Sequence, residues 1–210
     1  MLGKITHSKT RFGSYIINYE NMKDKFTPEN NDTSYKPLLY MALESTKGDV
    51  IEMGTGHGST LLLHEYCKGD RMLYSYDEKE EWGSKFYHLN SPTHSVKTIK
   101  DWDHVINLHK FKDADVIFID HAPGERRKED ILNFKNTKGI IVCHDTELGQ
   151  ADHGYQMRQH FPLFKYVVEV KTNGAWATAL SNEYDLTKWI GTEFGAYKIT
   201  EFINEPHYIP

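Results

Sequence analysis

The sequence has few of the features that mark secreted, thiolate-metal or membrane-spanning proteins. Only two cysteines occur among 210 residues, Cys67 and Cys143, and each falls within an apolar segment. A disulfide framework or a thiolate metal site therefore has little to build on. No apolar run approaches the ~20 residues that span a bilayer, and no charged-then-apolar leader opens the chain. We expect a soluble, cytoplasmic protein with both cysteines in its core.

The chain also lacks an excess of one charge. Its formal net charge is -5, from 25 basic and 30 acidic residues that are interspersed along the sequence. Such a chain presents no basic face that could follow a phosphate backbone, so neither nucleic acid nor a membrane is an expected partner. The local patch Arg126-Arg127-Lys128 could meet one phosphate group at most. A small molecule is the expected partner, and homo-oligomer formation is left open.

Strand-like and helix-like segments alternate along most of the chain. Continuous apolar runs such as 114–120 and 139–143 lack polar alternation, as expected for strands that are buried on both faces. The predicted strands are 49–54, 71–77, 95–100, 114–120, 139–145, 165–172 and 176–181, and the predicted helices are 35–44, 59–67, 78–89, 103–110, 125–135 and 154–160. This order predicts an α/β fold with a doubly wound, mostly parallel seven-stranded sheet. Only Asn173-Gly174-Ala175 separates the last two strands, which predicts an antiparallel terminal hairpin.

The length suits one domain over residues 1–210. Residues 1–32 are polar with scattered aromatics and no sustained period, so we expect them to form an N-terminal cover segment. Thr33 or Ser34 is the expected N-cap of the first helix. The core is expected over 34–182, and 183–210 reads as a poorly periodic C-terminal tail.

A glycine-rich turn follows the first predicted strand. In Asp49-Val-Ile-Glu-Met-Gly-Thr-Gly-His-Gly-Ser-Thr60 the motif E-x-G-x-G-x-G is formed by Glu52, Gly54, Gly56 and Gly58. Three glycines remove Cβ atoms from the turn, so that a nucleoside can lie against bare backbone, while Glu52 can meet an ammonium group or order the loop. A dinucleotide site would want G-x-G-x-x-G, whose last glycine falls where this chain has Ser59. The pattern is typical of S-adenosylmethionine (SAM) sites, and Thr55 and Ser59 belong to the expected cofactor turn.

Acidic residues follow the next two strands. Asp77 ends the second strand about twenty residues beyond the glycines, where a doubly wound fold places an acid on ribose hydroxyls, and it could also cap the following helix. Asp101 and Trp102 follow the third strand. They could contact the adenine amino group and ring, or they could be a helix cap and a core tryptophan.

Two later motifs give the chain a family resemblance. Asp115-Val-Ile-Phe-Ile-Asp-His121 resembles the fourth-strand signature of small-molecule O-methyltransferases, and Gly139-Ile-Ile-Val-Cys-His-Asp-Thr146 resembles the fifth-strand motif ending in HDT of sugar and cephalosporin-tailoring relatives. Over residues 34–182 the chain therefore resembles the class I SAM-dependent methyltransferases, with their Rossmann-like fold. Lys138 stands where those relatives have a first glycine, and the segment 122–127 departs from their sequence. The resemblance implies SAM as cofactor.

The fourth and fifth strands end in the residues with the best-suited chemistry for methyl transfer. His144 and His121 are candidate general bases, because a histidine of ordinary pKa is neutral and basic near pH 7. Alternatively, Asp120 and Asp145 could present hard oxygens to Mg²⁺ or Ca²⁺, with Glu147 as a third ligand. The resemblance implies metal ligands at these two strand ends, and Asp120 also borders the expected cofactor site. Mg²⁺ is thus a candidate second cofactor.

These features predict a SAM-dependent methyltransferase that acts on a hydroxyl of a small polar molecule, such as a sugar or a related natural product. The alternative is a protein that binds SAM or a nucleoside without methyl transfer, either a regulatory module or a SAM-cleaving enzyme. A dinucleotide-dependent oxidoreductase is disfavoured by the glycine spacing and the terminal hairpin.

Overall fold

The computed structural model describes residues 33–107, 109–148 and 155–203. The predicted cover segment 1–32 lies outside the described residues. So does most of the connection after Glu147, at residues 149–154. No helix of the described chain is long and apolar enough to cross a membrane.

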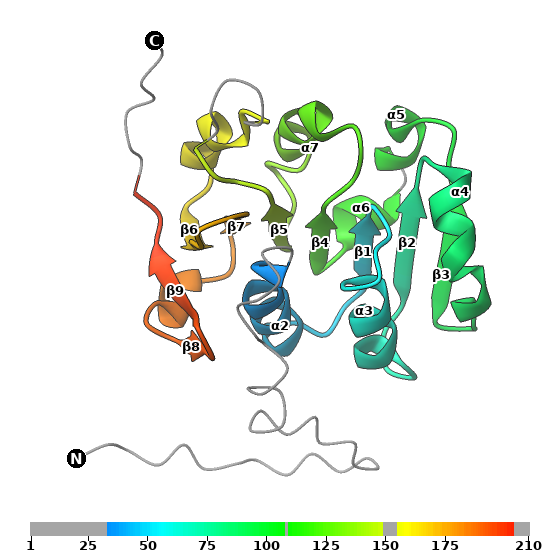
Figure 1. The fold of residues 1–210 in the computed structure, drawn as a ribbon, viewed down its shortest axis with the longest axis horizontal. Helices are drawn as coiled ribbons and strands as arrows, with labels where there is room; N and C mark the ends of the chain where they lie inside the picture. Colours follow the sequence, from blue (N-terminus) through cyan, green and yellow to red (C-terminus); the bar gives the residue numbers. More distant parts are fainter. Residues whose placement is uncertain (1–32, 108, 149–154, 204–210) are drawn as a thin grey trace.

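One sheet runs across the molecule in the order β3-β2-β1-β4-β5-β7-β6-β9-β8 (Figure 1). Its strands are β1 (Val50–Met53), β2 (Leu73–Asp77), β3 (His94–Thr98), β4 (Val116–Ile119), β5 (Ile140–His144), β6 (Tyr166–Val170), β7 (Ala177–Ser181), β8 (Glu193–Phe194) and β9 (Tyr197–Glu201). Strands β1 to β5 pair in parallel. Strand β7 is antiparallel to both β5 and β6, which confirms the predicted class of fold and its hairpin.

The sheet has nine strands in the described chain, and the predicted number of seven was wrong. The segment expected to be a poorly periodic tail adds β9 beside β6, and β8 beside β9. Strand β9 does alternate, with Tyr197 and Ile199 buried and Lys198 exposed. Because this period-2 pattern spans few residues and is flanked by polar ones, it is a weak signal for a strand in the sequence.

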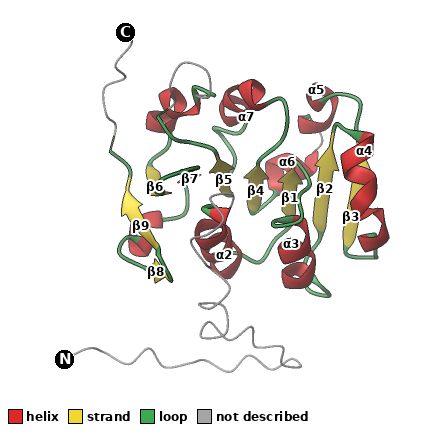
Figure 2. Cartoon of the chain, viewed as in Figure 1, coloured by secondary structure: helices red, strands yellow, loops and turns green. Residues whose placement is uncertain are grey.

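Helices cover both faces of the sheet (Figure 2). They are α2 (Lys36–Ser45), α3 (Thr60–Cys67), α4 (Glu80–Gly83), α5 (Trp102–Ile106), α6 (His109–Asp113) and α7 (Arg127–Asn133), with 3-10 helices η2 (Ser84–Leu89), η3 (Gly124–Arg126), η4 (Met157–Leu163) and η5 (Leu186–Trp189). One core cluster joins alternate strand residues to α2 and α3, and the other joins the intervening ones to α5, α6 and α7. Cys67 and Cys143 lie in these clusters as buried free thiols, as expected.

Several predicted helices are shorter or divided. The segment 78–89 forms α4 followed by the 3-10 helix η2. The segment 103–110 contains most of α5 and the first residues of α6. The segment 154–160 becomes the 3-10 helix η4, which contains Pro162; proline removes a backbone donor that an α-helix would need. Helix α2 begins at Lys36 after Tyr35, without a side-chain cap, so neither Thr33 nor Ser34 is its N-cap.

The strand order fixes where a ligand can bind. The chain leaves β1 toward β2 on one side, whereas β4 lies on the other side of β1. The crevice outside the carboxyl ends of two such strands is the usual ligand site of an open α/β sheet. The glycine turn follows β1, and Asp120 and His121 follow β4, so both predicted motifs meet at this crevice.

Candidate active site

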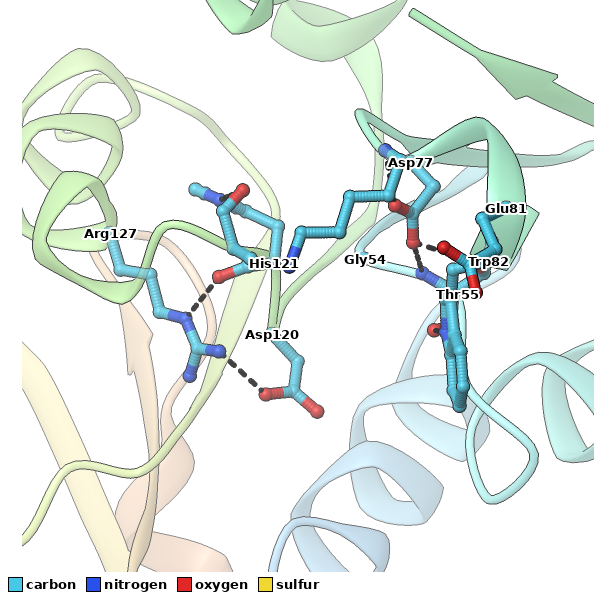
Figure 3. Close-up of a pocket in the computed structure, with 10 residues that line it drawn as sticks. Gly54, Thr55, Asp77, Glu81, Trp82, Asp120, His121 and Arg127 are labelled. Atoms are coloured by element: carbon cyan, nitrogen blue, oxygen red, sulfur yellow. Dashed lines mark hydrogen bonds and ion pairs between the residues drawn. The ribbon is translucent and has the colours of Figure 1, made fainter.

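A cavity of about 350 Å³ opens at the carboxyl ends of β1 and β4 (Figure 3). This volume lies within the usual range for small-molecule sites. Its lining residues are Gly54, Thr55, Asp77, Lys79, Glu81, Trp82, Asp120, His121, Ala122 and Arg127. Of the residues predicted from the sequence, five line it: Gly54, Thr55, Asp77, Asp120 and His121. Glu52, Gly56, Gly58, Ser59, Asp101, Trp102, His144 and Asp145 are not part of its lining.

Gly54 is the glycine that the turn requires. Its φ is +94°, and a Cβ at this position would lie 2.5 Å from the carbonyl oxygen of Asp120 and 2.6 Å from Cα of His121. The bare backbone lets the turn after β1 approach the end of β4. Gly56 differs from Gly54, because its φ lies outside the left-handed region and an added Cβ would meet only Oγ of Ser59, at 3.3 Å.

Glu52 orders the turn from beneath the cavity. Its carboxylate is fully buried, and Oε1 accepts a hydrogen bond from Oγ1 of Thr60 at 2.9 Å. The same Thr60 hydroxyl accepts from the backbone N–H of Gly56 at 2.9 Å. Burial raises the pKa of Glu52 to about 7, although hydrogen bonds from Ser59, Ser75 and Thr60 oppose the shift. The sequence left two roles open for Glu52, contact with an ammonium group or ordering of the loop. This geometry favours the ordering of the loop.

Asp77 stands on one wall of the cavity. Its Oδ2 accepts hydrogen bonds from the backbone N–H of Thr55, at 2.9 Å, and from the Thr55 hydroxyl, at 2.8 Å. Its Oδ1 accepts from the N–H of Lys79 at 2.9 Å, which ties the acid to the turn before α4. Trp82 continues this wall and donates its indole N–H to the carbonyl of Thr55. The acid is thus held in a fixed position at the cavity, as a ribose ligand would be.

Sequence reasoning missed the residues of this wall that follow Asp77. Lys79, Glu81 and Trp82 line the cavity because the chain turns sharply after β2 and α4 starts only at Glu80. The available signal was the short Glu-Lys-Glu-Glu-Trp run directly after the expected ribose ligand. It was interpreted only as the start of a helix.

Asp101 and Trp102 take the structural roles left open in the sequence. Oδ1 of Asp101 accepts a hydrogen bond from the N–H of Asp103 at 2.8 Å, which caps α5. Trp102 is 2% exposed and packs on the ring of His121, with ring centroids 4.4 Å apart. Since neither residue lines the cavity, the described geometry favours a cap and a core tryptophan over adenine recognition.

His121 is held in a buried pair. Its Nε2 lies 2.8 Å from Oδ2 of Asp130, and its Nδ1 lies 3.3 Å from the carbonyl oxygen of Ala122. Both His121 and Asp130 are almost fully buried. Because both ring nitrogens have partners, His121 is poorly placed to accept a proton from an acceptor. It forms part of the cavity wall instead.

His144, Asp120 and Asp145 form a second cluster beside the cavity. Nδ1 of His144 lies 3.3 Å from Oδ1 of Asp120 and 3.5 Å from Oδ1 of Asp145. Burial alone would lower the pKa of His144, but the hydrogen bond that its ring donates to Asp120 and the two carboxylate charges outweigh it, and the net pKa is raised. The other ring nitrogen, Nε2, is buried and has no hydrogen-bond partner among the described residues. The edge of the Tyr35 ring packs on this histidine, with centroids 4.9 Å apart.

Arg127 joins the two carboxylates of this cluster (Figure 3 shows it facing Asp120). Its Nη2 lies 3.1 Å from Oδ1 of Asp120, and its Nη1 lies 2.8 Å from Oδ2 of Asp145. Asp145 reaches it from a left-handed backbone conformation, with φ +56°, which aspartate tolerates better than most residues. The basic run Arg126-Arg127-Lys128 is therefore not a phosphate patch, since Arg126 pairs with Asp103 and Asp130.

Solved structures that resemble this chain include O-methyltransferases. The enzyme from Bacillus cereus, solved with S-adenosylhomocysteine (SAH), matches with a TM-score of 0.56 and 16% identity, over 78% of this chain and 88% of that one. TomG of Streptomyces achromogenes, involved in tomaymycin synthesis and solved with SAM, matches with a TM-score of 0.54 and 15% identity, over 71% and 79%. The chain has the class I methyltransferase fold. No protein-family model and no curated protein matches its sequence.

The methyltransferase fold raises the question of whether this site suits a divalent metal. Donor atoms of Asp120, His144 and Asp145 lie within 4.8 Å of one another, which is compact enough for one ion. However, the guanidinium of Arg127 already contacts both carboxylates, and like charges at such distances repel by several kcal/mol. The expected third ligand, Glu147, instead accepts a hydrogen bond from the N–H of Trp176 at 3.0 Å. The predicted Mg²⁺ therefore does not fit the arrangement of side chains.

Proposed function

We propose that this protein is a SAM-dependent O-methyltransferase that acts on a hydroxyl of a small polar molecule, such as a sugar or a related natural product. The observation that carries the proposal is the pairing of two unlike walls at one cavity. Asp77 and the Gly54 turn form one wall, and Asp120, beside His144, stands on the other. Solved structures of the same fold bound to SAM or SAH support the choice of cofactor.

The first wall has the donors and acceptors that a nucleoside needs. The backbone at Gly54 and Thr55 leaves room for close approach, Asp77 offers a carboxylate to ribose hydroxyls, and Trp82 offers an apolar ring. SAM, when bound, supplies an electrophilic methyl group. The chain's own residues have to orient the acceptor hydroxyl and remove its proton.

His144 is the proposed general base. We assign its Nδ1 proton to the hydrogen bond with Asp120, so that the lone pair of the neutral ring lies on the unpartnered Nε2. Nε2 accepts the hydroxyl proton, and the imidazolium that forms is stabilised by the carboxylates of Asp120 and Asp145. An aspartate that orients a histidine and balances its charge is a recurring solution in catalysis. Because Nε2 is buried, the side chains around it have to move before the acceptor can reach this atom.

The partners and location follow from the same proposal. We propose a small-molecule acceptor as the substrate, and neither nucleic acid nor a membrane as a partner. The two free, buried cysteines are compatible with the cytoplasm.

The remaining alternative is a protein that binds SAM without transferring its methyl group. Incubation with methyl-labelled SAM and extracts of small metabolites, followed by chromatography, separates the two. We expect label in a new small molecule with wild-type protein and none with His144→Ala. Tight SAM binding with no label transferred to any fraction would favour the binding protein.

A further inference from the structure

Arg127 forms ion pairs with both carboxylates of the one cluster in the described chain whose side chains could hold a metal ion. That cluster consists of Asp120, His144 and Asp145. Arg127 enters it from the first turn of α7, and its side chain is only 7% exposed. The buried guanidinium of Arg127 is thus a positive charge among the side chains that could otherwise bind a metal ion from solution.

The hydrogen bonds of Arg127 use its whole planar fork. Nε donates to the carbonyl oxygen of His121 at 2.8 Å, and Nη1 donates to Oδ2 of Asp145 at 2.8 Å and to the carbonyl oxygen of His144 at 3.4 Å. Nη2 adds an ion pair with Oδ1 of Asp120 at 3.1 Å. One rigid group therefore joins the ends of β4 and β5, and it holds one carboxylate of each in register.

We propose that Arg127 is the resident cation of this site, that it takes the place of a divalent metal, and that it positions Asp120 and Asp145 around His144. The reaction then requires no metal ion. This last statement rests on the proposed function, whereas the exclusion of metal by Arg127 does not. Arg127 is a positioning residue, because it acts through the two carboxylates.

The proposal predicts that removal of the guanidinium creates a metal site. Without it, two carboxylates and an imidazole remain within reach of one ion, a donor set that suits Mn²⁺. Arg127→Met keeps much of the side-chain volume and removes the charge. Lys128→Met is the matched control, since it removes the same charge from the next residue of α7, where Lys128 donates a hydrogen bond to Oε1 of Gln156 at 3.3 Å.

Mn²⁺ binding is measured by electron paramagnetic resonance on the full chain at low ionic strength. We expect no stoichiometric binding to wild type or to Lys128→Met. We expect one Mn²⁺ per chain in Arg127→Met, at least ~100-fold tighter than in wild type. The added substitution Asp145→Asn should abolish this binding. Arg127→Gln is a second neutral variant, in case Arg127→Met does not fold.

Two results would overturn the proposal. One is stoichiometric Mn²⁺ binding to wild type that Asp120→Asn or Asp145→Asn removes, a measurement that needs no Arg127 variant. The other is a folded Arg127→Met or Arg127→Gln variant that binds no metal. Neither result depends on methyl transfer, so failure of the proposed function is seen separately, as absence of label transfer. Where transfer is observed, full wild-type activity after exhaustive chelation is expected, and its loss would also contradict the proposal.

Discussion

Substitution of Glu52 by glutamine should remove a large part of the pH dependence of stability. Burial raises the pKa of this carboxyl from its ordinary value of 4.5 to about 7. The folded protein therefore retains a proton there that the unfolded chain releases. The stabilising contribution of the protonated group is fully present below pH 4.5 and is lost as the pH rises through about 7.

The magnitude follows from the size of the shift. At about 1.4 kcal/mol per pKa unit, the difference between 4.5 and about 7 corresponds to about 3 kcal/mol of unfolding free energy. Most of this contribution, about 2–3 kcal/mol, is lost between pH 5 and pH 8. His94 contributes the opposite slope, because burial, with the charge of His64 as a smaller cause, lowers its pKa to about 4. Only the difference between wild type and variant isolates Glu52.

Urea unfolding at pH 5 and pH 8, followed by tryptophan fluorescence, supplies this difference. Between the two pH values, the unfolding free energy of wild type should fall by about 2–3 kcal/mol more than that of Glu52→Gln. Glu65→Gln is the matched control, since Glu65 lies on α3 with an exposed carboxylate and should change nothing. Equal pH dependence in wild type and Glu52→Gln would refute the assignment of a buried, proton-retaining carboxyl beneath the glycine turn.

Three further predictions concern the cavity. Asp77→Ala should weaken SAM binding by roughly 1–3 kcal/mol by calorimetry, through the lost charge-assisted hydrogen bonds, and unchanged affinity in a folded variant would exclude Asp77 as the ribose ligand. Gly54→Ala should destabilise the fold by more than about 2 kcal/mol in urea, from its positive φ and the contact with Asp120, whereas Gly56→Ala should cost little; equal losses would contradict the geometry of the turn. His144→Ala should lower turnover by about 10²–10⁴ with SAM affinity nearly intact. The wild-type rate should rise with pH through a pKa above 6.5, and Asp120→Asn should move this pKa to a lower value. A wild-type rate that does not change between pH 6 and 9 would eliminate His144 as the base.

The sequence predicted those features that depend on local pattern. Strands β1, β4 and β5 were evident because short, mostly apolar runs are typical of strands that are buried on both faces of a parallel sheet. Their order then brought Gly54, Asp77 and Asp120 to one edge of the sheet, where the structure has its cavity. Strand β8 was missed because its two residues provide no period.

The contacts of Arg127 could not be predicted in the same way. Its partners, Asp120 and Asp145, lie at different strand ends, and nothing in the sequence states which of three consecutive basic residues turns inward. The distinction is made by packing, since Arg126 reaches Asp103 instead. The two aspartates alone indicated a metal site, and the ion pairs that Arg127 makes with both of them could not enter that interpretation. The carboxylates were evident from the sequence, but their counter-ion was not.

The central claim is that the cavity between β1 and β4 binds SAM, and titration calorimetry with the full chain tests it most directly. We expect one SAM per chain, displaced by SAH, with affinity weakened in Asp77→Ala and retained in Lys128→Met. We also expect no comparable binding of NAD. Absence of SAM and SAH binding to the folded protein, or preferential binding of the dinucleotide, would contradict it.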